Sequence, residues 1–108
     1  QNFPIKLPFR DHNNFSSNHL YIIRLKLKNI KKKHIEIFNE FRQVGINVNL
    51  HYIPIYRQPF FKKKFKFKRI DFPESENFYK EAISLPIFPD ITKKEIKYII
   101  DNAQKIIN

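Results

Sequence analysis

The residues with the clearest chemical potential lie between Asn47 and Tyr56. His51 follows two amide side chains, Asn47 and Asn49, at alternating positions, and Tyr52 and Tyr56 come after it. An imidazole beside amides can donate hydrogen bonds to an anionic or sugar-like ligand. The other interpretation is that His51 is an ordinary polar residue on an exposed strand face. Tyr56 is expected to be exposed at the same rim, so both residues are candidates for binding.

Other chemistry has little support in the sequence. The four histidines show no ligand spacing with acidic residues and there is no cysteine, so a metal site is not expected. The single glycine excludes a glycine-rich phosphate loop. Ser75 and Ser84 have no base placed by sequence, and the dipole of a helix explains Glu74 and Glu76. His34 is expected to be a hydrogen-bonded core residue. No self-contained active site is therefore predicted.

Alternation of apolar and polar residues predicts a half-buried strand over residues 46–52. Its apolar positions place Tyr52 toward the core and His51 on the open face. Pro54 removes a backbone donor and ends regular pairing. Such a strand presents polar groups near its end.

The remaining pattern predicts an α+β fold, in which a small antiparallel or mixed sheet is backed by helices on one face. Residues 19–27 are apolar on both faces and predict a central strand. A helix is expected over 30–44, ended by Gly45, and then a loop over 53–70. A second helix opens at Pro73, with a buried side of Phe78, Tyr79, Ala82 and Ile83. An edge strand at 84–89 precedes a helix over 93–107, which Thr92 caps and whose core stripe is Ile96, Ile99, Ile100, Ala103 and Ile107.

The net charge of +11 is concentrated in part between Arg57 and Arg69. Basic residues at 62–64, 66, 68 and 69 alternate there with phenylalanines. This segment could stack on bases while pairing with phosphates, or it could fold onto its own domain with the lysines directed outward. The surplus of Lys, Asn, Ile and Phe also fits a low-GC genome without any selection for an anionic partner. The charge alone does not decide between these explanations.

The chain is expected to hold one small domain with one core. Residues 1–18 contain Pro4, Pro8 and clusters of Asn and Ser, which predict an extended linker or arm. Residues 19–108 form the domain itself. The chain starts in this extended segment without an initiator methionine, so a domain cut from a longer protein is expected.

Several motifs occur in an order and spacing that resemble a known family. They are SSNHLYIIRL at 16–25, Gly45-Ile46, HYIPIY at 51–56, FPESE at 72–76, and ISLPIFP at 83–89 followed by Thr92. This arrangement resembles the C-terminal domain of the DegT/DnrJ/EryC1/StrS aminotransferases over nearly all of residues 8–107. The run at 49–61 is most similar to the branch that serves pseudaminic-acid synthesis.

The resemblance implies a fold-type-I enzyme that uses pyridoxal 5′-phosphate to transfer an amino group, with glutamate as the expected donor, to a keto sugar nucleotide. Its cofactor-binding lysine would lie in a preceding large domain, so no catalytic or cofactor-binding residue is assigned here. His51, Tyr52 and Tyr56 match positions on the substrate side of the family's active site. The implied enzyme is a cytoplasmic homodimer without a membrane or nucleic-acid partner, and this domain alone would be inactive.

Two other functions stay open on the sequence. One is a free-standing basic module that binds nucleic acid or another polyanion. The other is a regulatory or scaffold domain that reuses the same fold.

Overall fold

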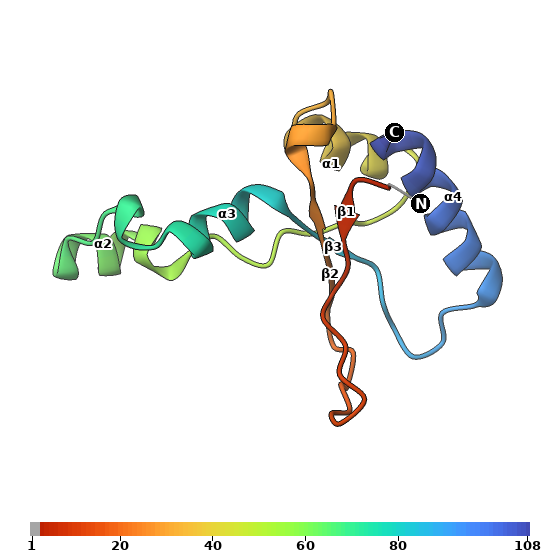
Figure 1. Ribbon diagram of the computed structural model, residues 1–108, viewed down its shortest axis with the longest axis horizontal. Coiled ribbons are helices and arrows are strands. Elements are labelled where there is room, and N and C mark those ends of the chain that lie inside the picture. The colour runs from red at the N-terminus through yellow and green to blue at the C-terminus, as the bar shows by residue number, and fades with distance from the viewer. Residues whose placement is uncertain (1–2) are drawn as a thin grey trace.

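The computed structural model describes residues 3–108 and shows a three-stranded antiparallel sheet with four α-helices (Figure 1). The strands are β1 (Ile5–Lys6), β2 (Tyr21–Leu25) and β3 (Ala82–Leu85), in the order β1-β2-β3. Ile5 pairs with Leu25, and Ile23 pairs with Ile83. The α+β class and the central position of β2 are confirmed. The strand at Ile5–Lys6 was not predicted within the expected linker.

Helices α1 (His34–Gln43) and α4 (Lys93–Ile107) pack together over one face of the sheet (Figure 1). Their apolar stripes and the odd-numbered strand residues form the core. Its buried members are Ile23, Leu25, Ile37, Phe41, Ile46, Val48, Ile83, Ala103, Ile106 and Ile107. Gly45 follows α1 with φ +81°, as its helix-ending role predicts. The α4 boundaries are those predicted, but Ile96 and Ile100 are half exposed, so that part of the predicted stripe is wrong.

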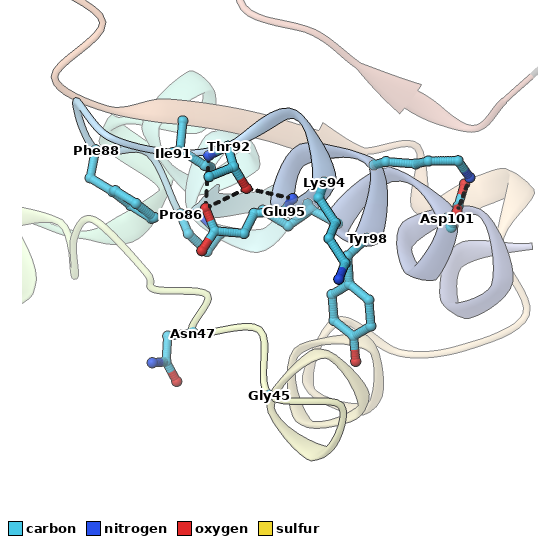
Figure 2. A pocket seen from close by; sticks show the side chains of 12 residues that line it. Gly45, Asn47, Pro86, Phe88, Ile91, Thr92, Lys94, Glu95, Tyr98 and Asp101 are labelled. Carbon is cyan, nitrogen blue, oxygen red and sulfur yellow. Dashed lines mark hydrogen bonds and ion pairs between the residues drawn. The ribbon is translucent and has the colours of Figure 1, made fainter.

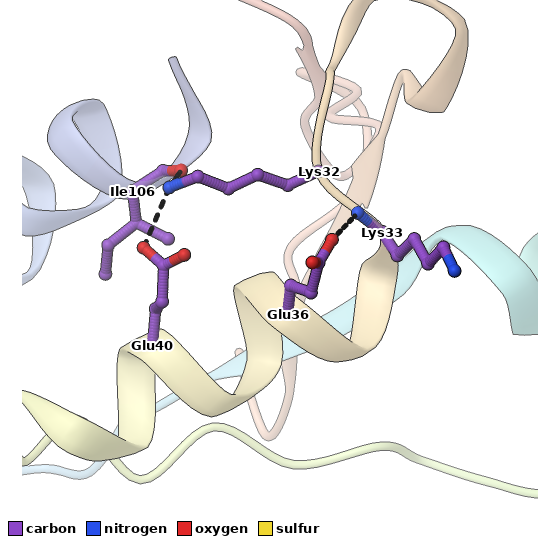
Figure 3. A network of polar contacts seen from close by, with 5 residues as sticks. All are labelled: Lys32, Lys33, Glu36, Glu40 and Ile106. Carbon is purple, nitrogen blue, oxygen red and sulfur yellow. Dashed lines mark hydrogen bonds and ion pairs between the residues drawn. The ribbon is translucent and has the colours of Figure 1, made fainter.

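A lysine joins the ends of these two helices (Figure 3). Lys32 Nζ donates to the Glu40 carboxylate at 2.8 Å and to the backbone carbonyl of Ile106 at 2.8 Å. The carbonyls at a helix C-terminus carry partial negative charge, so a cation there is favourable. In the same figure the Lys33 N–H donates to Glu36 at 2.6 Å, which satisfies a backbone group at the start of α1. Lys32 therefore has a structural role in joining α1 to α4.

Residues 55–81 extend away from α1 and α4, and we call them the arm (Figure 1). The arm holds α2 (Pro59–Phe65), α3 (Pro73–Glu81) and short 3-10 helices at Ile55–Arg57 and Arg69–Asp71. The prediction of a loop over 53–70 is therefore wrong. Pro59 at the first helical position starts α2, and Lys66 in the left-handed conformation (φ 54°) ends it. The loop between β1 and β2 also projects from the sheet (Figure 1), and the radius of gyration is 15.7 Å, against about 13 Å for a compact chain of this length.

Two further predictions need correction. The segment 46–52 forms no continuous strand, because only Asn49 pairs with the sheet, opposite Ser84. Helix α3 ends at Glu81, so Ala82 and Ile83 belong to β3 and not to a helix face. Pairing with β2 outweighs helix periodicity there, and Pro86 then ends the strand earlier than the predicted 84–89.

Candidate ligand-binding groove

An open groove of about 600 Å³ lies where the arm meets the sheet. It is lined by β2, the segment after Tyr52, the 3-10 helix at Ile55–Arg57 and α3. The lining residues are Arg24, Tyr52, Pro54, Ile55, Tyr56, Phe72, Glu74, Ser75, Phe78 and Tyr79. Two of the three predicted site residues are therefore brought to one surface. The third, His51, lies next to Tyr52 in the chain but does not line the groove.

His51 is half-buried and bonded to β3. Its Nδ1 lies 2.8 Å from the Ser84 hydroxyl, and its ring makes an edge contact with Tyr52 at 4.6 Å. Ser84 is on the sheet face opposite the core, together with Arg24 and Ala82. Ala82 and Ser84 are buried on this face, whereas Asn47 and Asn49 are exposed, so the predicted open face is open only in part. His51 packs on the sheet with one ring nitrogen engaged.

The two tyrosines have the opposite exposures to those predicted. Tyr52 was expected to face the core but is 71% exposed, because the alternation of the segment stops after Val48. Tyr56 was expected at an exposed rim but is 6% exposed, and its ring stacks on Phe72 with centroids 4.4 Å apart. Tyr52 is therefore accessible to a ligand, whereas Tyr56 supports the groove from beneath.

A buried carboxylate, Glu76, organises the arm. It accepts a hydrogen bond from the Tyr56 hydroxyl at 2.5 Å and from Arg57 Nε at 3.0 Å, and a second guanidinium nitrogen binds its other oxygen. The hydrogen bonds from Arg57 and Tyr56 lower the pKa of Glu76 to about 2. Burial and the Glu76 contact raise the pKa of the Tyr56 hydroxyl. At neutral pH this group is therefore an ionised carboxylate held by a cation and a neutral phenol.

The arginines beside the groove are already paired. Arg57 binds Glu76 and lies 4.7 Å from the centre of the Tyr79 ring. Arg24 binds Glu81 at 2.8 Å and so ties β2 to the end of α3. Their charges are neutralised locally, so they order the groove more than they attract an anion.

The free positive charge lies further along the arm. Its cations are Lys62, Lys63, Lys64, Lys66, Lys68 and Arg69, which are all exposed and form no ion pair within residues 3–108. The phenylalanines between them are organised as stacked rings: Phe65 stacks on Phe61 at 6.1 Å and on Phe67 at 5.5 Å. The aromatic faces of Phe65 are thus used inside the arm. Lys64 Nζ lies 5.5 Å from the centres of the Phe60 and Phe65 rings, and the lysines of this segment are all exposed.

A second open cavity, of about 710 Å³, lies beside the start of α4 (Figure 2). Several of its polar groups have structural partners. The Thr92 hydroxyl accepts from the Glu95 N–H at 3.1 Å, and Glu95 accepts from the Thr92 N–H at 2.8 Å, which confirms the predicted cap. Lys97 binds Asp101 at 2.6 Å. Helix capping and this ion pair therefore account for Thr92, Glu95, Lys97 and Asp101.

Sequence reasoning missed Glu76, Arg57 and Ser84 as parts of the site. Arg57 and Glu76 are 19 positions apart, and no periodicity connects a loop cation to an acid in the first turn of a helix. Ser84 was set aside because no base was placed near it, yet the bridge to Asn49 brings His51 against it. His34 makes the predicted hydrogen bond, with its Nε2 2.8 Å from the Ala82 carbonyl, but it is half-buried and lies outside the core.

Two negative observations apply to the part of the chain that the structure describes. No group of three or more His, Asp or Glu side chains there is placed to hold a metal ion. No helix in residues 3–108 combines the length and apolar character needed to cross a membrane.

Comparison with known proteins identifies the class of the chain. The model of the DegT/DnrJ/EryC1/StrS aminotransferase family matches residues 1–104. The chain is 34% identical over 92 residues to the UDP-4-amino-4,6-dideoxy-N-acetyl-beta-L-altrosamine transaminase of Campylobacter jejuni, covering 85% of this chain and 24% of that protein. This chain therefore belongs to the DegT/DnrJ/EryC1/StrS aminotransferase family.

Solved structures agree with this assignment. Helicobacter pylori PseC, an aminotransferase of pseudaminic-acid biosynthesis, matches with a TM-score of 0.77 and 28% identity, over 85% of this chain and 24% of PseC. A putative sugar aminotransferase of Streptococcus pneumoniae in its PLP form matches with a TM-score of 0.78 and 26% identity, over 97% of this chain and 28% of that one. The chain spans about a quarter of the length of the relatives it matches.

Proposed function

We propose that this chain is the small C-terminal domain of an aminotransferase that depends on pyridoxal phosphate and aminates a keto sugar nucleotide. The family match over residues 1–104 carries this proposal. The expected pathway is surface-polysaccharide or pseudaminic-acid biosynthesis, because two of the similar proteins belong to such pathways by name. Residues 1–18 would lead in from a large domain and supply β1 to the sheet, and residues 19–108 would form the rest of the small domain. The expected amino donor is glutamate, and the expected enzyme is a homodimer.

The residues described here do not themselves fit the cofactor. No lysine lines the groove beside Tyr52, and fifteen of the sixteen lysines are exposed; the exception is the half-buried Lys32, bonded to Glu40 and Ile106. The cofactor-binding lysine is thus assigned to the large domain, and no chemical step is assigned to this chain. We expect the chain alone to be inactive.

The proposed role of this domain is to border the sugar-nucleotide site. Tyr52 presents an exposed ring at the groove, and His51 offers its second ring nitrogen beside it. Tyr56 holds the groove floor through Glu76. The unpaired cations at 62–64, 66, 68 and 69 add attraction for a diphosphate.

Catalysis by the enzyme that contains this chain tests the proposal. That enzyme should show the absorbance of bound pyridoxal phosphate and should aminate a UDP-linked keto sugar with glutamate, as followed by mass spectrometry. The 108-residue chain alone should do neither. Neutralising Lys62, Lys63 and Lys64 together should raise KM for the sugar nucleotide, whereas neutralising Lys93, Lys94 and Lys105 on α4 should not. Activity of the chain alone, or none in the enzyme, would contradict the proposal.

A second function has one observation in its favour. Six unpaired cations within eight residues of the arm suit binding to nucleic acid or another polyanion. Binding of random DNA oligomers that weakens steeply with salt would support this alternative. If the chain is instead part of the proposed enzyme, it should bind these DNA oligomers only weakly and without a defined site size.

A further inference from the structure

Ser84 is one of the most tightly held residues of the sheet. It lies in β3, opposite Ile22 of β2, and is 3% exposed. On its other side it exchanges two backbone hydrogen bonds with Asn49, at 2.8 and 3.0 Å. These contacts fix the position of the Ser84 hydroxyl. They also hold Asn49, which lies two positions before His51 in the chain.

The Ser84 hydroxyl and His51 Nδ1 can share a proton in two ways. Either the hydroxyl donates to an unprotonated Nδ1, or a protonated Nδ1 donates to the oxygen. In the second case the hydroxyl proton would need another acceptor. Within residues 3–108 the only side-chain partner of Ser84 is His51, at 2.8 Å. A buried hydroxyl proton without an acceptor is unfavourable, so the first arrangement is preferred.

We infer that Ser84 is a positioning residue that holds neutral His51 in the tautomer protonated at Nε2, and so makes His51 a hydrogen-bond donor. The two ring nitrogens point in divergent directions, so Nε2 is directed away from β3. No hydrogen bond engages Nε2 within the described residues. This inference rests on the proposed function only in taking the acceptor to be a substrate atom.

The tautomer determines which ligand atoms His51 can recognise. A proton on Nε2 selects an acceptor, such as a hydroxyl, carbonyl, carboxylate or phosphate oxygen, and disfavours an ammonium or amide donor. Ordering of the ring before binding also lowers the entropic cost of the contact. Ser84 thus contributes to ligand selection without touching the ligand.

Nitrogen NMR of the histidine rings tests the tautomer directly in the 108-residue chain. At a pH where His51 is neutral, its Nδ1 should have the shift of an unprotonated nitrogen and its Nε2 that of a protonated one. His34 is an internal reference, because its Nε2 faces the Ala82 carbonyl and must carry a proton to bond there. The nitrogen shifts of the exposed His19 give the values for a ring whose tautomers are not constrained. A His51 spectrum showing a proton on Nδ1, or a mixture like that of His19, would overturn the inference.

Variants at Ser84 add a second test. In Ser84→Ala the His51 shifts should move toward those of His19 while the His34 shifts stay unchanged, and Ser84→Thr should retain the wild-type pattern. Unchanged His51 shifts in a folded Ser84→Ala chain would contradict the inference. If Ser84→Ala does not fold, the wild-type spectrum still decides.

Kinetics of the enzyme that contains this chain separate this inference from the proposed function. Ser84→Ala should raise KM for the sugar nucleotide by about tenfold, with kcat less affected. Ser84→Thr, which keeps the hydroxyl, should have a KM close to that of the wild type. His51→Ala should raise KM at least as much. If His51→Ala has this effect and Ser84→Ala does not, the positioning role fails while the function stands. If His51→Ala has no effect, the proposed substrate contact fails and the positioning role fails with it, even where the NMR tautomer is as expected.

Discussion

The sheet with α1 and α4, which we call the body, and the arm at residues 55–81 are stabilised by different interactions. The body contains eight of the ten residues of the aliphatic and aromatic core, the other two are Ile46 and Val48 in the segment after α1, and none lies in the arm. In the arm only Tyr56 and Glu76 are buried, and α2 has no buried residue. Stacked rings and the Glu76 contacts with Arg57 and Tyr56 hold it instead.

The residues that stabilise the fold are therefore in a different region from the residues proposed to bind a ligand. Burial of apolar surface is the dominant source of stability, so the free energy of unfolding depends mainly on the body. The exposed side chains of the groove and the unpaired cations lie on or beside the arm. Regions with few buried apolar contacts open locally at low cost, which suits a surface that must adjust to a ligand.

Removal of a large side chain from the body should have the largest effect on stability. Phe41 is fully buried, so Phe41→Ala should lower the free energy of unfolding by about 3–5 kcal/mol. Urea denaturation measures the change. The matched control is Phe60→Ala in the arm, which is 64% exposed and should change stability by less than about 0.5 kcal/mol. Equal losses in the two variants would refute the division into body and arm.

Loss of the Glu76 charge should loosen the arm without unfolding the body. Glu76→Gln keeps the shape but removes the charge that binds Arg57. Amide hydrogen exchange should accelerate several-fold in residues 55–81 and stay near wild type in α1 and α4. Glu74→Gln, at an exposed position in the same helix, is the control and should leave exchange unchanged. Faster exchange throughout the chain would show that the arm and the body open together.

The lowered pKa of Glu76 also predicts how the arm responds to acid. The pKa of Glu76 is about 2 in the folded chain against 4.5 ordinarily, so between these values the open state binds more protons. Its stabilising effect is complete above about pH 4.5 and is lost as the pH falls toward 2. Protection of the arm should decline over this range in the wild type. In Glu76→Gln the decline should be smaller, and a profile identical to the wild type would rule out Glu76 as its cause.

Patterns within one element were predictable from the sequence, and contacts between elements were not. The central strand, α1 and α4 follow from local periodicity, and the Thr92 cap follows from its spacing to Glu95. Pro54 and Pro59 indicate a loop over 53–70, and the helix that follows Pro59 has only seven residues, too few for a clear periodicity. The exposure of Tyr52 and the burial of Tyr56 depend on where a partly paired segment leaves the sheet. Such long-range placement has no local signal.

A smaller effect is expected at the cap of α4. Thr92→Ala removes the hydroxyl that accepts from the Glu95 N–H and should cost about 1 kcal/mol of unfolding free energy. Thr92→Ser keeps the hydroxyl and should be close to wild type. Thermal unfolding compares the variants. Because α4 belongs to the body, exchange in the arm should not change, and a loss of protection confined to the arm would contradict the comparison.

The central claim is that the groove between arm and sheet borders a sugar nucleotide, while the body holds the fold. Hydrogen exchange of the enzyme that contains this chain, with and without a UDP-linked keto sugar, measures this directly. The account predicts added protection at Tyr52 and across residues 55–81, with little change in α1 and α4. Protection confined to the cavity beside α4, or absent from this chain, would contradict it.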